Sequence, residues 1–195
     1  MISAILLAAG QSKRMGKSKL LMPFGQSTMI EQTVDNLLGS AANEVVVVLG
    51  DRAGAVKRLI AERPVKLAIN PDYEQGMSTS IVAGLKLVDR RTGAVMIALG
   101  DQPLIDSQTI NRLIAGFLSH DKGIAIPTYR GERGHPVIFD VKYWRQMLTL
   151  DGDVGARQIV QKNPDDIIEV AVDCEGIQID IDTADCYYLE SNRLK

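Results

Sequence analysis

Four basic side chains follow a turn of small residues near the start of the chain: Lys13, Arg14, Lys17 and Lys19. The turn consists of three residues whose side chains are too small to keep a ligand away from the main chain: Ala8, Ala9 and Gly10. Gly10 can also adopt a positive φ, which would strain another residue. Backbone N–H groups beside positive side chains suit a polyphosphate, and the alternative is an ordinary solvated basic loop. The turn of small residues directly before the charges favours phosphate binding.

Two well-known phosphate-binding loops do not match this stretch. The P-loop reads G-x-x-x-x-G-K-[ST], but here one residue too many separates Gly10 from Gly16-Lys17-Ser18. The dinucleotide fingerprint G-x-G-x-x-G is also absent, because Gln11 and Ser12 follow Gly10. The sequence therefore predicts a phosphate-binding loop of a third kind.

Aspartates that could hold a metal ion stand near the ends of two predicted strands. Asp101 follows a fully apolar run, within the sequence GDQP. Asp180 and Asp182 are two residues apart, so their side chains point to the same face of an extended segment. Magnesium usually takes one or two protein carboxylates plus phosphate oxygens and water, so a single well-placed aspartate can start a site. Each could instead be structural, Asp101 as a turn residue and Asp182 or Thr183 as the cap of the last helix.

Other polar residues have a structural explanation as well as a functional one. Gly76 precedes a predicted helix whose first turn carries three hydroxyls, and these can simply cap the helix. They belong to Ser78, Thr79 and Ser80. His135 precedes Pro136 and is one of two histidines, and a lone histidine in such a place is more often structural than catalytic.

The overall composition is that of one globular domain. The chain has 195 residues, 46% of them hydrophobic, which is enough for one substantial core. Its formal net charge of −2 points neither to nucleic acid nor to an anionic membrane surface. Cys174 and Cys186 form neither a metal-type cluster nor a disulfide framework. Without a leader-like start or an apolar stretch of about 20 residues, we expect a soluble cytoplasmic protein.

Strands and helices are expected to alternate in the first part of the chain. Apolar runs predict strands buried on both faces, at 4–7, 44–49, 65–69 and 94–99. Helical spacing predicts helices at 29–39, 53–62, 77–89 and about 107–119. Thr28 and Glu31 have the spacing of a capping box, and Asp106 or Ser107 is expected to cap the fourth helix.

This alternation predicts an α/β fold of Rossmann-like, three-layer α/β/α architecture with a mostly parallel sheet. Ligands of such sheets bind at the carboxyl ends of the strands, near the topological switch point. Gly10 and Asp101 both fall at such ends. The two could therefore face each other across a cleft.

The second part of the chain is less regular. We expect strands at 123–127, 136–139, 167–172 and 177–181, of which a hairpin around Glu175-Gly176 could join the last two. Helices are expected at 141–150, 153–161 and 183–194, and a polar loop at 129–134. No repeat or linker divides the chain, so we predict a single domain over residues 1–195.

Residues Leu7 to Lys19 resemble the signature L-A-A-G-x-S-x-R-M-G-x-x-K of small nucleotidyltransferases, and they match it throughout. With the later segments GMSTS, GDQP, GHP and DIDT, the chain resembles the molybdenum cofactor cytidylyltransferase (MocA-like) family, which has a nucleotide-diphospho-sugar transferase-like fold. Ala184 stands where this family usually has proline, a helix-start position at which the change costs little function. Ala9 favours cytosine, because the related guanylyl enzymes usually carry a second glycine there.

The resemblance implies transfer of CMP from CTP to the phosphate of molybdopterin or molybdenum cofactor, with Mg²⁺ as cofactor and release of pyrophosphate. A phosphate acceptor is already largely anionic at neutral pH, so no general base is required. The partners would be a nucleoside triphosphate, a phosphorylated pterin and a molybdenum hydroxylase as client, with neither nucleic acid nor membrane. The alternatives are a GTP-dependent guanylyltransferase, a cytidylyltransferase for another phosphorylated small molecule, and a non-catalytic carrier that hands the cofactor to a hydroxylase.

The resemblance also implies roles for individual residues. Arg14 and Lys19 would act on the triphosphate, with Asp101 completing the catalytic group. The nucleotide would contact the loop and the later turn, at Leu7, Ala8, Ala9, Gly10, Arg14, Lys19, Gly76, Ser78 and Ser80. Magnesium would be held by Asp101 and by Asp182 in preference to Asp180, and the anionic acceptor would meet His135 and Arg157. Residues 1–120 would then be the nucleotide-binding half, and 121–195 the acceptor-side half that completes the metal site.

Overall fold

The structure is a computed structural model that describes residues 1–12, 15 and 18–193. Within these residues a mixed sheet has eight strands, in the order β10-β7-β9-β6-β1-β4-β5, with β8 beside β7. β9 pairs antiparallel with both neighbours and β8 pairs antiparallel with β7, whereas the other pairings are parallel. The predicted, mostly parallel sheet is therefore confirmed. Its strands are β1 (Ile2–Ala8), β4 (Glu44–Leu49), β5 (Lys66–Ile69), β6 (Ala94–Leu99), β7 (Ile124–Tyr129), β8 (Glu132–Arg133), β9 (Val137–Asp140) and β10 (Ile167–Ala171).

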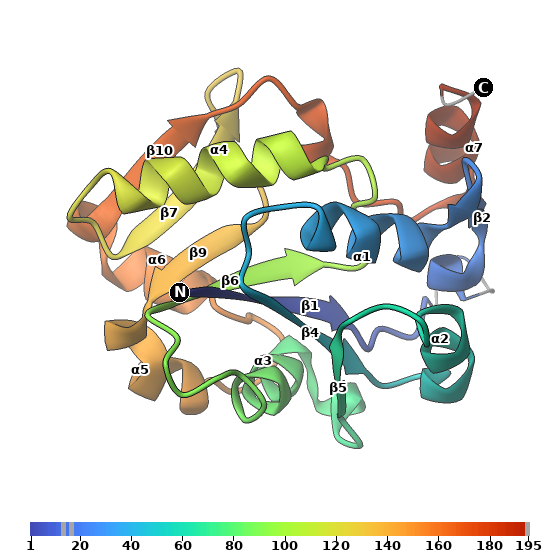
Figure 1. Ribbon diagram of the computed structural model, residues 1–195, viewed down its shortest axis with the longest axis horizontal. Helices are drawn as coiled ribbons and strands as arrows, with labels where there is room; N and C mark the ends of the chain where they lie inside the picture. Colours follow the sequence, from blue (N-terminus) through green and yellow to red (C-terminus); the bar gives the residue numbers. More distant parts are fainter. Residues whose placement is uncertain (13–14, 16–17, 194–195) are drawn as a thin grey trace.

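Helices cover both faces of this sheet, as Figure 1 shows. α1 and α4 pack on one face, and α3, α5 and α6 pack on the other. Successive residues of a buried strand point to opposite faces, so Leu6 belongs to the core under α1 and Ile5 to the core under α3. The three-layer α/β/α architecture is confirmed. The helices are α1 (Met29–Leu38), α2 (Ala53–Leu59), α3 (Met77–Leu85), α4 (Ser107–Leu118), α5 (Trp144–Leu148), α6 (Arg157–Lys162) and α7 (Ala184–Asn192).

β1 lies at the topological switch point of the sheet. The chain moves outward from β1 through β4 and β5, and then returns to place β6 on the other side of β1. Leu7 is in register with Val48 on β4 and with Leu99 on β6, so the carboxyl ends of the three strands lie side by side. This is the edge at which α/β sheets bind their ligands.

The predicted helix caps are present. Glu31 Oε2 accepts from the backbone N–H of Thr28 at 2.9 Å, and Thr28 Oγ1 accepts from the backbone N–H of Glu31 at 3.5 Å, which completes the capping box of α1. Asp106 caps α4 by accepting from Thr109 N at 2.7 Å. Thr183 caps α7, as one of the two alternatives expected there.

In the first part of the chain, two helices end several residues earlier than expected. α2 ends at Leu59 instead of residue 62, four residues before Arg63, whose position before Pro64 disfavours helical backbone. α3 ends at Leu85 instead of residue 89, and the backbone N–H of Asp89 donates instead to Glu44 Oε1 at 2.7 Å.

The predicted strand at 177–181 is wrong, and so is the hairpin that would have joined it to β10. Residues Glu175–Gln178 form a 3-10 helix, and β10 pairs with β7 in parallel. Gly176 lies so close to Leu104 that a Cβ added there would be 2.8 Å from the Leu104 Cβ. The close packing of this segment against the chain after β6 therefore replaces strand pairing. The polar loop expected at 129–134 contains β8, which forms a hairpin with β7. No helix in the described part of the chain is long and apolar enough to span a membrane.

Candidate active site

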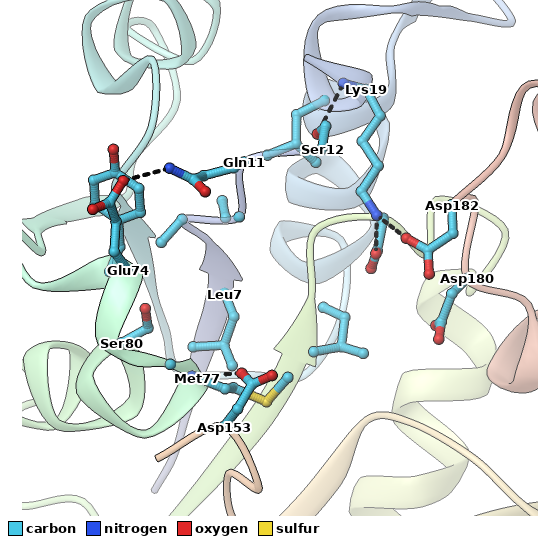
Figure 2. A pocket seen from close by; sticks show the side chains of 18 of the residues that line it. Leu7, Gln11, Ser12, Lys19, Glu74, Met77, Ser80, Asp153, Asp180 and Asp182 are labelled. Atoms are coloured by element: carbon cyan, nitrogen blue, oxygen red, sulfur yellow. Dashed lines mark hydrogen bonds and ion pairs between the residues drawn. The ribbon is translucent and has the colours of Figure 1, made fainter. Parts of the chain in front are cut away.

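A cavity of about 680 Å³ opens at the carboxyl ends of β1 and β6. The end of β1 lies in the middle of the cavity, with Glu74 and Ser80 on one side of it and Lys19, Asp180 and Asp182 on the other. Figure 2 shows side chains from these segments pointing toward one another. Most of the residues predicted for the site line this cavity: Leu7, Ala8, Ala9, Gly10, Lys19, Gly76, Ser80, Asp101, Asp180 and Asp182.

The Lys19 side chain extends along the cavity and ends between two carboxylates. Its Nζ atom donates to Asp101 Oδ2 at 2.5 Å and to Asp182 Oδ1 at 2.5 Å, as Figure 2 shows for Asp182. Burial alone would lower the pKa of Lys19, but the two carboxylates outweigh it and raise that pKa above its usual value. Two acids far apart in the sequence therefore converge on one positive charge.

This pair of carboxylates fits a divalent cation. Asp101 and Asp182 already direct one oxygen each at the same ammonium nitrogen, which stands where an ion could be held. In the described part of the chain, no three or more His, Cys, Asp or Glu side chains are grouped to hold a metal by themselves. Such a site would need phosphate oxygens and water as further ligands, which is how magnesium is usually bound.

Asp180 lies beside this pair but has a different partner. Its Oδ1 atom accepts a hydrogen bond of 2.8 Å from Nε2 of Gln102, and the Gln102 side chain is 2% exposed. Burial, together with the nearby charges of Asp101 and Asp182, raises the pKa of Asp180 above its usual range. Sequence reasoning missed Gln102 as a contact of the site, because GDQP alone does not reveal where its amide points.

The predicted phosphate loop differs in detail from the expectation. The positive φ falls on Ser12, at 51°, and not on Gly10. A Cβ at Gly10 would meet no atom within 4 Å, so the missing side chain leaves open space at the cavity wall. Ser12 Oγ accepts from the backbone N–H of Lys19 at 3.2 Å, and Gln11 Nε2 donates to Glu74 Oε1 at 2.7 Å, as seen in Figure 2. Arg14, the other predicted phosphate ligand, lies outside the described residues.

The turn before α3 is closed by the second part of the chain. Gly76 has a φ of 117°, and a Cβ there would lie 2.6 Å from the carbonyl oxygen of Gly152. The backbone N–H groups of Met77 and Ser78 donate to Asp153 Oδ1 at 3.1 Å and to the Gly152 oxygen at 3.2 Å. The first backbone N–H groups of α3 therefore find their acceptors in another segment, because the N-cap residue, Gly76, has no side chain that could accept from them.

The serines of this turn are placed differently. Ser80 lines the cavity, and its Oγ accepts from Asn70 Nδ2 at 3.0 Å. Ser78 is fully buried outside the cavity lining, and its Oγ has no hydrogen-bond partner among the described residues. Thr79 Oγ1 donates back to the Gly76 carbonyl at 2.9 Å. Contact between the nucleotide and Ser78 therefore stays a prediction that this arrangement does not favour.

The two predicted acceptor contacts lie outside the cavity lining. His135 is anchored through its backbone N–H, which donates to the Ile177 carbonyl at 2.9 Å. Burial lowers the pKa of His135, while the nearby Asp101 opposes this shift. Arg157 is the first residue of α6 and is exposed. Asp153, four residues before Arg157 in the sequence, lines the cavity instead.

Known proteins resemble this chain along almost its whole length. It is 32% identical to nicotine blue oxidoreductase from Paenarthrobacter nicotinovorans, over 96% of this chain and 95% of the relative. It is 28% identical to the molybdenum cofactor cytidylyltransferase of Escherichia coli (strain K12), over 98% of this chain and 96% of that protein.

A solved structure is similar to the same extent. Rv0371c from Mycobacterium tuberculosis H37Rv superimposes with a TM-score of 0.88 at 29% identity, covering 98% of this chain and 97% of that one. A structure of Rv0371c in complex with manganese gives a TM-score of 0.83 at 26% identity, with 98% of each chain covered. Residues 4–167 match the family model of the MobA-like NTP transferase domain, and this match includes most of the residues that line the cavity. The chain therefore belongs to the family of MobA-like NTP transferase domains.

Proposed function

We propose that this protein is a CTP:molybdenum cofactor cytidylyltransferase. The observation that carries the proposal is the convergence of Asp101 and Asp182 on Lys19, in a cavity that is also lined by a turn of small residues. That arrangement suits a metal-bound triphosphate. The similarity to the Escherichia coli molybdenum cofactor cytidylyltransferase supports the choice of base and acceptor.

In the proposed reaction, a phosphate oxygen of the acceptor attacks the α-phosphorus of CTP. The bond from that phosphorus to the bridging oxygen of the β-phosphate breaks, and pyrophosphate leaves with the electron pair. The acceptor oxygen is already anionic, so no proton has to be removed by the protein. The protein then contributes mainly positioning and charge stabilisation.

The residues divide this work between them. Asp101 and Asp182 would hold Mg²⁺, which when bound neutralises charge on the triphosphate. Lys19 and Arg14 would contact the phosphates, so Lys19 has to leave its present place between the carboxylates. The backbone of Ala8 to Gly10 would approach the nucleotide closely. His135 and Arg157 remain proposed acceptor contacts, with residues 121–195 as the acceptor-side half and a molybdenum hydroxylase as client.

Pyrophosphate release tests this proposal. The protein is incubated with Mg²⁺, purified molybdopterin cofactor and each of the four NTPs in turn, and pyrophosphate is measured. We expect release with CTP. Release with GTP alone would instead show a guanylyltransferase, release only with another phosphorylated acceptor would show a different cytidylyltransferase, and cofactor binding without release would show a carrier.

Two substitutions connect this activity to the site. Asp101→Asn and Arg14→Ala should each lower turnover about 10²–10³-fold, because the first weakens the Mg²⁺ site and the second removes a positive charge directed at the triphosphate. Asp173→Asn is the matched control, since the Asp173 side chain is 98% exposed and does not line the cavity. Unchanged turnover in either site variant would overturn the assignment of the site.

An oxidoreductase is the second candidate, because the identity to nicotine blue oxidoreductase is 32% over nearly the whole chain. The measurement is the absorbance of nicotine blue during incubation with the protein and a reductant. Bleaching without any pyrophosphate release in the first assay would favour this candidate over nucleotidyl transfer.

A further inference from the structure

Gln102 is a buried amide between the end of β6 and the segment that carries Asp182. Its Nε2 group donates to Asp180 Oδ1 at 2.8 Å and, less closely, to the Ile177 carbonyl at 3.4 Å. Its Oε1 atom is buried and has no hydrogen-bond partner among the described residues. The amide donors of Gln102 are therefore directed at the Ile177 carbonyl and at the Asp180 carboxylate.

The segment that Gln102 contacts has no strand pairing to hold it. Residues Glu175–Gln178 form a 3-10 helix, and α7 begins only at Ala184. Between the two, the backbone N–H of Ile181 donates to the Asp101 carbonyl at 3.1 Å. Together with the Gln102 amide, this hydrogen bond ties the segment to the end of β6 on either side of Asp180.

The Gln102 amide does more than fill space. An apolar side chain of similar length would occupy the same volume but would leave the Asp180 carboxylate without this hydrogen-bond donor. What an apolar side chain could not do is give Asp180 a fixed direction. The amide therefore contributes orientation.

Orientation matters because Asp180 lines the same cavity as Asp101 and Asp182. Asp101 and Asp182 face the Lys19 ammonium, whereas Asp180 Oδ1 faces Gln102. A third carboxylate at the same point would repel the other two and take a ligand position that magnesium usually leaves to phosphate or water. Holding Asp180 aside leaves the remaining ligand positions for the triphosphate.

We propose that Gln102 is a positioning residue of the metal–triphosphate site. Its amide holds Asp180 away from the cation position and fixes the 177–182 segment so that Asp182 faces Asp101. This inference rests on the proposed function for its consequence in catalysis. The placement of the segment can be measured without any substrate.

Three variants separate positioning from simple packing. Gln102→Met keeps the length of the side chain and removes both donors. Gln102→Glu combined with Asp180→Asn exchanges donor and acceptor, so the hydrogen bond can re-form and the charge of the pair is unchanged. Gln146→Met is the control, because Gln146 is exposed on α5, away from the cavity lining.

Two readouts are taken with the full chain. Manganese alone is titrated by the electron paramagnetic resonance of the free ion, and the amide exchange of peptides covering 175–183 is followed by mass spectrometry. In Gln102→Met we expect the Mn²⁺ dissociation constant to rise about 10–100-fold, as for other partners that orient metal ligands. Amide exchange in 175–183 should accelerate, because Asp180, which precedes Ile181, loses the hydrogen bond from Gln102 that holds it in place. The double variant Gln102→Glu, Asp180→Asn should bring both readouts back toward wild type.

Where the wild type binds Mn²⁺, a wild-type value of either readout in Gln102→Met would overturn the inference. So would a double variant that remains as impaired as Gln102→Met, because the contact with position 180 would then not be what matters. The thermal unfolding midpoint of each variant excludes a general loss of folding. If the wild type bound no Mn²⁺ and released no pyrophosphate, the proposed function would fail, and the amide exchange would still decide whether Gln102 positions the segment.

Discussion

Lys19 occupies the position between Asp101 and Asp182 that a divalent cation would take under the proposed function. The three side chains are 12%, 19% and 25% exposed, so their charges are only partly screened by water. The ammonium thereby compensates two carboxylates that would otherwise repel each other. Binding of metal and triphosphate must then exchange one cation for another.

Lys19→Met tests this exchange. We expect the variant to bind Mn²⁺ more tightly than wild type in the absence of nucleotide, because the competing ammonium is gone. Turnover should fall about 10²–10³-fold, since a charge directed at the triphosphate is lost. The metal-free variant should also be less stable by about 1–3 kcal/mol, with recovery on adding Mn²⁺. Mn²⁺ titration, pyrophosphate release and chemical denaturation measure the three effects.

Lys66→Met is the matched control for this variant. Lys66 also forms an ion pair, 2.7 Å from Glu44, but it is 48% exposed and lies outside the cavity lining. Its loss should leave Mn²⁺ affinity and turnover unchanged. Weaker Mn²⁺ binding in Lys19→Met would show that Lys19 does not compete for the cation position.

His135 gives the fold a pH dependence with a definite sign. Its pKa in the folded state is below the ordinary value of 6.5, because burial disfavours the imidazolium ion. The unfolded chain therefore binds a proton before the folded one as the pH falls, and the stabilising contribution present above pH 6.5 is lost as the pH falls through the folded pKa.

His135→Gln should remove this contribution. We expect the free energy of unfolding of wild type to fall more steeply below pH 6.5 than that of the variant, by at most about 1.4 kcal/mol per pH unit. Urea denaturation at several pH values measures the slopes. Equal slopes in wild type and His135→Gln would contradict the prediction.

The residues of the site were predictable to different degrees. The wall of small residues and Asp101 could be placed because they end apolar runs that become β1 and β6, whose carboxyl ends adjoin at the switch point. The alternation of side chains placed Asp180 and Asp182 on one face, but it could not show that Asp180 accepts a hydrogen bond from Gln102. That distinction depends on packing between segments about 80 residues apart, which local patterns do not encode.

At the scale of elements, the strands of the first half were predictable because each is an apolar run bounded by turn residues. The predicted strands at 44–49 and 94–99 coincide with β4 and β6. The capping box predicted the start of α1 for a local reason, since both of its partners lie within four residues. The predicted strand at 177–181 is wrong because the apolar side chains of this segment pack against the chain after β6, and its backbone does not pair with a strand.

Gly134→Ala tests how closely this segment must approach the sheet. A Cβ at Gly134 would lie 2.2 Å from the Ile177 carbonyl oxygen, so the two backbones would have to separate. We expect a loss of about 1–3 kcal/mol in the free energy of unfolding, as for other overpacked sites. Turnover should fall as well, because the displaced segment carries Asp182. Denaturation and pyrophosphate release measure both.

Gly54→Ala should have the opposite effect on the free energy of unfolding. Gly54 lies in α2, where an added Cβ would meet no atom within 4 Å, so alanine should stabilise the helix by about 0.5–1 kcal/mol. Turnover should stay at the wild-type level. A Gly134→Ala protein as stable and active as Gly54→Ala would contradict the close approach of the two backbones.

At the scale of the molecule, the site is assembled from both ends of the chain. The first half supplies the end of β1, Lys19, the α3 turn and Asp101, and the second half supplies Asp153, Asp180 and Asp182. The eight-stranded sheet joins the two parts, because β9 pairs with β6 on one side and with β7 on the other. The architecture could be predicted from alternating elements, but the placement of the last segment could not, because it has no strand of its own.

The exchange of the Lys19 ammonium for a metal ion can be observed in crystals grown with CTP and Mn²⁺, through the anomalous scattering of the metal. We expect one metal peak between Asp101 and Asp182, in contact with phosphate oxygens of the nucleotide, and Lys19 moved from that place onto the triphosphate. A metal peak elsewhere with the nucleotide bound, or Lys19 still lying between the two carboxylates, would overturn the proposed site.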